Sequence, residues 1–207
     1  MAGILDILGP ALSGGTLQQL SSAVGTDDQT TQRAAMAALP VILGAMNRNT
    51  NDPQQAQSLA SALERDHDGG ILDNLGGFLG GLTGAGAPSD AAGVNARAAN
   101  GTGILGHIFG NQLSQVQQGV GKATGLDSGQ VMKMMVALAP MVMGYLGRQK
   151  RQQNLNAGGL SDLLGREASN ARSAAPNDLM GMLGGLLDRD GDGSPIDDVL
   201  GGLLGKR

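Results

Sequence analysis

The chain has 207 residues, no cysteine, no tryptophan, one tyrosine, two phenylalanines and a formal net charge of −4 at pH 7. The absence of cysteine excludes disulfides, thiol catalysis and cysteine-ligated metal centres. The acidic balance argues against a general binder of the nucleic-acid backbone. A core with so few aromatic residues must be built from Leu, Ala, Val, Ile and Met, which suits closely packed helices better than a β-sandwich. Composition therefore predicts an all-α protein.

The first predicted unit, residues 1–83, is a series of helical segments separated by Gly- or Pro-containing breaks. The expected elements are an apolar segment over 4–12 and helices over 17–24, 27–48 and 54–63. Gly25 suits a left-handed cap that ends the short helix. Pro40 should kink or divide the long helix, because proline lacks an amide proton and clashes with the preceding turn. The last helix leads into a first acidic loop at 64–74.

A second predicted unit, residues 104–150, repeats the first. Residues 23–48 recur one hundred positions later at 123–148, and the repeat includes Gly125 and Pro140. Asp127 begins the second long helix and, with the glutamine three residues later, has the spacing of a capping pair. We therefore expect two similar helical units in one chain.

The second long helix is rich in methionine. Its apolar side chains surround the helix almost completely, which indicates either a central place in the core or an adaptable contact surface. The methionines concerned are Met132, Met134, Met135, Met141 and Met143.

Two segments of small and polar residues, 84–103 and 151–179, are predicted to be linkers. The final segment, 180–207, carries a second acidic loop at 188–198 between two Leu-Gly-Gly helices. Glycines spaced four residues apart in these helices permit close helix contact.

Both acidic loops place carboxylates at alternate positions before a glycine, a pattern that offers Ca²⁺ its oxygen ligands around a tight turn. The predicted ligands are Asp188, Asp190, Asp192, the Ser194 carbonyl and Asp198 in the second loop, and Glu64, Asp66, Asp68, the Gly70 carbonyl and Asp73 in the first. Like charges this close repel without a counter-ion, which favours a cation; the alternative is a set of Asx turns and helix caps in solvent. The usual acid at position twelve is replaced by Leu75 and Val199.

These loops resemble those of EF-hand and dockerin-like proteins. The chain also resembles a bacterial family, the domain-of-unknown-function 937 family, through Ala-Leu-Pro at 38–40, Gly44 and the segment 63–73. The resembling stretches are most of 1–83, then 104–148 and 183–204. The resemblance implies an all-helical protein and no known reaction.

The sequence lacks the usual signatures of catalysis. Its two histidines, His67 and His107, have neither the spacing of a zinc site nor the partners of a catalytic triad. His67 occupies the fourth loop position and is expected to point outward. No Walker loop, dinucleotide-binding glycine motif or nucleophile elbow is present. We therefore do not expect an enzyme.

The sequence thus predicts a non-enzymatic helical binding or scaffold protein with calcium-binding loops. Its expected partner is itself or another protein, through the Met-rich and Leu-Gly-Gly faces. One alternative is a self-assembling structural protein in which metal is incidental. A second is a helix-turn-helix-like nucleic-acid binder, suggested by Gly25 and Asp27 between two helices, although the acidic balance opposes it.

No membrane span is predicted from the sequence. The longest apolar stretch, 131–146, is interrupted by Lys133 and Pro140 and is shorter than the roughly 20 residues that a span requires. The N-terminus lacks the positive segment of a signal peptide. A cytoplasmic location is expected, with leaderless export left open.

Overall fold

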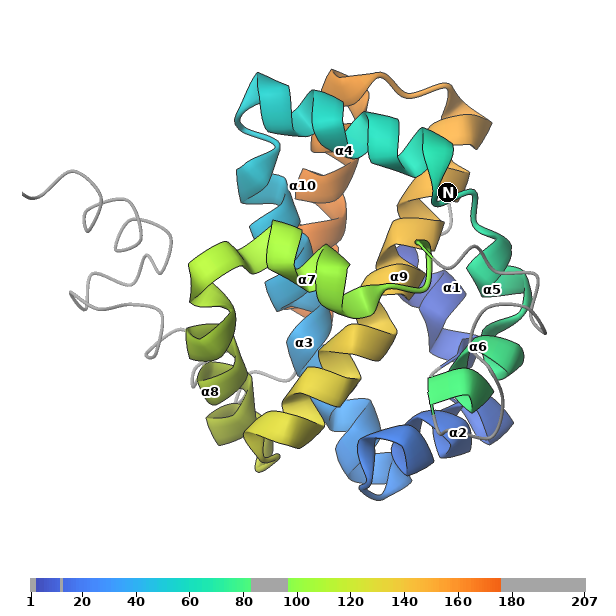
Figure 1. The fold of residues 1–207 in the computed structure, drawn as a ribbon, viewed down its shortest axis with the longest axis vertical. Helices are drawn as coiled ribbons and strands as arrows, with labels where there is room; N and C mark the ends of the chain where they lie inside the picture. Colours follow the sequence, from blue (N-terminus) through green and yellow to red (C-terminus); the bar gives the residue numbers. More distant parts are fainter. Residues whose placement is uncertain (1–2, 12, 83–96, 176–207) are drawn as a thin grey trace, which may run out of the picture.

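The computed structural model describes residues 3–11, 13–82 and 97–175, and all regular structure within these ranges is helical (Figure 1). The predicted all-α class is confirmed. The α-helices are α1 (Ile4–Ala11), α2 (Gly14–Val24), α3 (Asp28–Asn49), α4 (Pro53–Arg65), α5 (Gly70–Asp73), α6 (Leu75–Leu82), α7 (Gly101–Phe109), α8 (Leu113–Thr124), α9 (Ser128–Gln153) and α10 (Ala157–Ala174), and a 3-10 turn, η1 (Gly110–Gln112), joins α7 to α8.

The sequence repeat is visible in how two helix pairs are joined, α2 to α3 and α8 to α9. Gly25 and Gly125 end the shorter helices with positive φ angles of 85° and 78°, a region that glycine adopts without strain. Asp27 and Asp127 then cap the longer helices by accepting a backbone N–H from the first turn. At the second cap, the Gln130 side chain completes a capping box, as predicted.

Neither long helix is divided by its proline. Pro40 lies inside the 22-residue α3 and Pro140 inside the 26-residue α9, and both side chains are buried. Of the predicted kink or division, the division is therefore wrong. An interior proline costs a helix about 3 kcal/mol, and burial of the surrounding apolar face offsets that cost here.

Helices α3 and α9 contact each other at the centre of the molecule and are covered by the other helices (Figure 1). Residues from both predicted units join one continuous hydrophobic core. Met134, Met135 and Met141 of α9 are fully buried, so this part of the Met-rich helix occupies the core. Helix α9 has the length and composition of a membrane-spanning helix, but 72% of its most apolar window is buried, as in a core helix.

The linker predicted over 151–179 is wrong, because α10 forms there and packs along α3. Asn156 caps the helix by accepting the Gly159 N–H at 2.9 Å. Its buried apolar residues recur at helical spacing, which the intervening polar residues obscured. They are Leu160, Leu163, Leu164, Ala168 and Ala171. Of the linker predicted over 84–103, residues 84–96 lie outside the described part of the chain, and α7 begins at Gly101.

A buried carboxylate on α10 holds the start of α1. Glu167 is 5% exposed, and its two oxygens accept the Ile4 backbone N–H at 2.9 Å and the Tyr145 hydroxyl at 2.8 Å. Burial, followed by the hydrogen bond to Glu167, raises the pKa of Tyr145 well above its usual range. The hydroxyl therefore stays a donor, and α1, α9 and α10 meet at one carboxylate.

Candidate functional site

The first acidic loop lies against α9, a helix of the second predicted unit. Glu64 forms an ion pair with Lys150, and Asp73 accepts Arg148 Nη2 at 2.6 Å. The same Arg148 nitrogen donates to the Gly69 carbonyl at 3.0 Å. These contacts join residues 75 to 86 positions apart in the sequence, so the loop ties the first unit to the second.

Glycines of α9 allow the loop backbone to approach the helix. A Cβ atom added at Gly147 would lie 1.7 Å from the His67 carbonyl oxygen, and one added at Gly144 would lie 2.6 Å from Ile71 Cγ2. Such separations are far inside van der Waals contact. The turn itself depends on Gly69, whose φ is 90°. The loop is therefore seated on a surface of α9 that any larger side chain would obstruct.

The four predicted carboxylate ligands of the first loop each have a partner within the protein. Glu64 and Asp73 form the ion pairs with α9 described above. The Asp66 carboxylate lies 3.9 Å from Arg65 Nη2 and 4.0 Å from Arg97 Nη1. Asp68 accepts the Gly70 N–H at 2.9 Å, an Asx-type turn. Across the described ranges, no three His, Asp or Glu side chains are grouped to hold a metal ion.

The stronger of the two predicted calcium sites, with Asp188, Asp190, Asp192, Ser194 and Asp198, lies outside the described residues. Calcium binding there stays a prediction.

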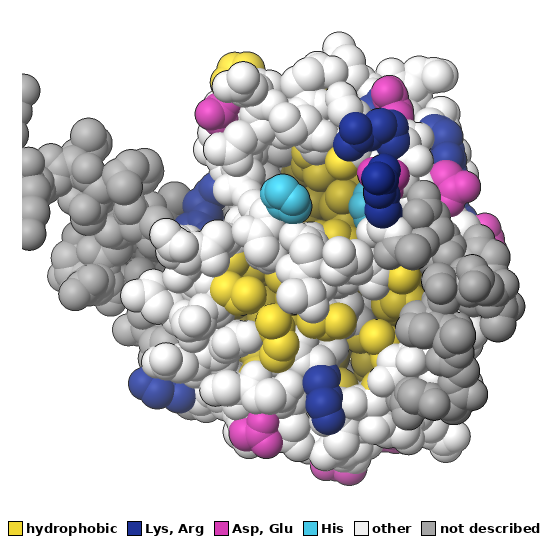
Figure 2. Space-filling model, in the orientation of Figure 1, with side chains coloured by type: hydrophobic (Ala, Val, Ile, Leu, Met, Phe, Trp, Pro, Cys, Tyr) yellow, Lys and Arg dark blue, Asp and Glu magenta, His cyan; other side chains and the backbone are white. Residues whose placement is uncertain are grey.

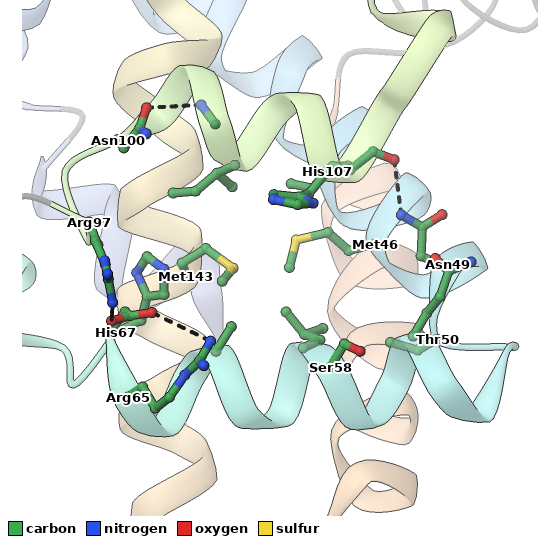
Figure 3. A pocket seen from close by; sticks show the side chains of 17 residues that line it. Met46, Asn49, Thr50, Ser58, Arg65, His67, Arg97, Asn100, His107 and Met143 are labelled. Atoms are coloured by element: carbon green, nitrogen blue, oxygen red, sulfur yellow. Dashed lines mark hydrogen bonds and ion pairs between the residues drawn. The ribbon is translucent and has the colours of Figure 1, made fainter.

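Beside the loop, a pocket of about 640 Å³ opens between α3, α4, α7 and α9 (Figure 3). Its floor is apolar, and the space-filling view shows this floor between the side chains of the two histidines, with arginine and aspartate at one side (Figure 2). The apolar lining residues are Met46, Leu59, Ala62, Ile104, Ile108 and Met143. The polar lining residues are Asn49, Thr50, Gln55, Ser58, Arg65, Asp66, His67, Arg97, Asn100 and His107.

His67 is buried in the wall of this pocket, so the expectation that it points outward is wrong. It is 5% exposed, and its ring lies beside Met143 and Arg97 (Figure 3). The reason is the docking of the loop, which places the His67 carbonyl against Gly147. Within the described structure, the buried Nδ1 atom has no hydrogen-bond partner. Burial lowers the pKa of His67, and the negative charges of Asp66 and Asp68 partly oppose this shift.

Charge is concentrated at the end of the pocket next to the loop. The guanidinium groups of Arg65 and Arg97 both approach the carboxylate of Asp66 (Figure 3). The arginine side chains are 70% and 79% exposed, whereas that of Asp66 is 15% exposed. Arg65 and Arg97 thus both lie near the Asp66 carboxylate, and Asp68 adds a second carboxylate whose charge acts on His67.

Hydrogen bonds fix the helix that forms the opposite wall, α7. Asn100 caps it by accepting the Gly103 N–H at 2.9 Å, and the Asn49 side chain donates to the Ile108 carbonyl at 2.9 Å from α3 (Figure 3). Helix α7 is thus held in place at both ends by hydrogen bonds within the protein. A pocket wall that is already ordered lowers the entropic cost of binding a ligand.

Sequence patterns alone did not reveal this pocket. Its lining comes from segments between Met46 and Met143 that are far apart in the chain. The two histidines were its one visible signal, and each is isolated in the sequence.

The model of one protein family, described as bacterial protein of unknown function (DUF937), matches residues 6–149. All residues that line the pocket fall within this match, as does the first acidic loop. No curated protein and no solved structure matches the chain.

Proposed function

We propose that this chain, which belongs to the DUF937 family of bacterial proteins of unknown function, acts as a non-enzymatic helical binding protein. The pocket between α3, α4, α7 and α9 carries the proposal, because it combines an apolar floor with a rim of polar side chains. Ligand pockets typically have volumes of roughly 300–1,000 Å³ and present apolar surface together with polar groups that orient the ligand. The absence of a catalytic motif in the sequence favours binding over catalysis.

The proposal is tested by filling the pocket. Ala62→Phe places a ring over the apolar floor, whereas Gln57→Phe places the same ring on the exposed face of the same helix. A set of small organic fragments is titrated into each ¹⁵N-labelled protein, and amide shifts of α4 and α7 are followed by NMR. We expect binding to the wild type and to Gln57→Phe, and its loss in Ala62→Phe. No binding by the wild type at millimolar concentration, or equal binding by all three proteins, would refute the proposal.

We also propose that the second acidic loop, 188–198, binds calcium. Asp188, Asp190 and Asp192 offer carboxylates at the alternate positions that Ca²⁺ uses. A cation at the first loop has to compete with the arginine and lysine of α9, so the second loop is the favoured site. Calorimetric titration with Ca²⁺ should give heat for the wild type and for Asp73→Asn, and none once Asp190 and Asp192 are both replaced by Ala. A wild type without heat would end this part of the proposal.

A further inference from the structure

Two arginine side chains lie together where α10 packs along α3 (Figure 1). The helices run antiparallel, since Thr50 Oγ1 lies 3.1 Å from Ser161 Oγ while Gly44 lies near the end of α10. A Cβ atom added at Gly44 would lie 3.1 Å from Arg172 Nη2, so this guanidinium covers the glycine. The half-buried Arg48 follows one helical turn later. Helical side chains lean toward the start of their own helix, so the two arginines of these antiparallel helices lean toward each other.

The described residues supply no counter-charge to this arginine pair. Neither Arg48 nor Arg172 has an ion-pair or hydrogen-bond partner within the described ranges. Burial, followed by the positive charge of Arg172, lowers the pKa of Arg48, and no carboxylate opposes this shift. Each arginine is in the last turn of its helix, where the helix dipole favours a cation. That preference does not offset the repulsion between two like charges, so the surface is suited to an acidic group from elsewhere.

The internal repeat indicates which acidic group this is. Gly144 and Arg148 of α9 are the counterparts of Gly44 and Arg48, one hundred positions later. The first acidic loop covers Gly144, and its Asp73 accepts Arg148 Nη2 at 2.6 Å. The first loop therefore crosses from its own unit to the long helix of the other. A second loop that crossed in the same way would lie on α3.

The second acidic loop carries the matching carboxylate. Asp73 follows Gly69 by four residues in the first loop, and Asp197 follows Gly193 by four residues in the second. Over 188–198 there are five aspartates and one arginine, so the loop is acidic as a whole. Asp197 is not one of the predicted calcium ligands, so an ion pair with it leaves those ligands free.

The length of the chain permits this contact. Helix α10 ends two residues after Arg172, so the chain leaves the described structure beside the arginine pair. The roughly 20 residues that follow, up to Asp197, span as much as about 70 Å when extended. The loop therefore reaches the pair without any movement of the helices.

The contact cannot copy the first loop in every detail. Asn47 occupies the position at which α9 has Gly147, the glycine that lets the first loop approach closely. The second loop must therefore be held by charge more than by close backbone packing. Arginine suits this role, because its planar fork of N–H groups matches a carboxylate.

We infer that the second acidic loop docks within its own chain on the surface between α3 and α10, with the Asp197 carboxylate paired to Arg48 and Arg172. The two acidic loops are then exchanged between the units, the first on α9 and the second on α3. This inference depends neither on the proposed pocket function nor on calcium binding.

A spin label tests where the loop lies. The chain has no cysteine, so Val199→Cys provides a single attachment point for a nitroxide next to the loop. In the ¹⁵N-labelled full chain, without added calcium, the nitroxide should broaden the amide signals of Gly44 and Asn47, and its reduction should restore them. The measurement is repeated on a mixture of spin-labelled unenriched protein with ¹⁵N-labelled protein that carries no nitroxide, where no broadening is expected.

Further substitutions in the labelled protein locate the ion pair. Asp197→Asn, Arg48→Gln and Arg172→Gln should each reduce the broadening, whereas Asp198→Asn and the exposed Arg151→Gln should leave it unchanged. Asp197→Asn alters no described residue, so it tests the pair even if an arginine variant fails to fold. Absence of broadening in the labelled protein, or broadening that survives Asp197→Asn, would overturn the inference. Broadening in the mixture would assign the contact to a second copy of the chain and overturn it equally.

Discussion

Gly147→Ala is the most direct test of how the first acidic loop is held. The added methyl group would lie 1.7 Å from the His67 carbonyl oxygen and 2.9 Å from its carbonyl carbon. Both atoms belong to the backbone, so no side-chain rotation relieves the clash. The loop must retreat from α9 by at least about 1 Å to restore ordinary contact. That movement loosens the ion pairs of Glu64 and Asp73 at the same time.

The expected magnitude follows from two opposing effects. Alanine is favoured over glycine within a helix by up to about 1 kcal/mol. Forcing an extra methyl group into a filled space is unfavourable by about 1–3 kcal/mol. Gly106→Ala is the matched control, because its Cβ would meet no atom within 4 Å and it also lies inside a helix. We expect Gly147→Ala to have a free energy of unfolding about 2 kcal/mol below that of the control.

Urea unfolding followed by circular dichroism measures this difference. Hydrogen exchange of the Leu72 amide, which donates to the Gly69 carbonyl at 3.0 Å, reports on the loop itself. Exchange at Leu72 should accelerate in Gly147→Ala and stay unchanged in Gly106→Ala. If the two variants unfold at the same urea concentration and protect Leu72 equally, the loop does not lie on α9 as described.

Three further predictions concern buried or capping groups. Glu167→Ala leaves the Tyr145 hydroxyl and a backbone N–H without their acceptor, so the free energy of unfolding should fall by about 2 kcal/mol or more, and an unchanged melting temperature would contradict the buried contact. Asp127→Ala removes a helix cap and should be destabilising by about 1 kcal/mol in urea unfolding, with no loss contradicting the capping box. Burial lowers the pKa of His67 in the folded state. As pH falls below about 6.5, the unfolded chain therefore binds a proton that the folded chain does not yet bind, and the free energy of unfolding decreases. Unfolding measured from pH 7.5 to 5 should therefore depend less on pH in His67→Gln than in the wild type; equal slopes would show that burial does not govern this titration.

The helical class and the two long helices could be predicted because their signals are local. Gly25 and Asp27, with their counterparts one hundred residues later, mark the end of one helix and the start of the next without reference to the rest of the chain. The same local reasoning predicted that the proline would kink or divide each long helix, and the division did not occur. Its effect is decided by burial in the core, which no short stretch of sequence reveals.

The parts that could not be predicted depend on contacts between distant residues. Glu64 and Lys150 are 86 positions apart, and nothing in either segment indicates that they pair. The protein partners of the acidic residues in the first loop could therefore not be predicted, and calcium binding by this loop stays a prediction. Helix α10 was missed for a related reason, because its apolar stripe is narrow and its partner, α3, lies far away in the sequence.

The docked loop also forms one end of the pocket, which couples the two features experimentally. Asp66 and His67 line the cavity and belong to the first acidic loop. This loop can pack closely against α9 because Gly147 has no side chain. Gly147→Ala leaves α3, α4 and α7 unchanged, yet it should weaken the binding of the small organic fragments, because the bound state requires the loop in place and that state becomes less populated. Gly106→Ala, measured alongside, should bind as the wild type does. A Gly147→Ala protein that is destabilised but binds the fragments with unchanged affinity would show that the loop does not form part of their binding site.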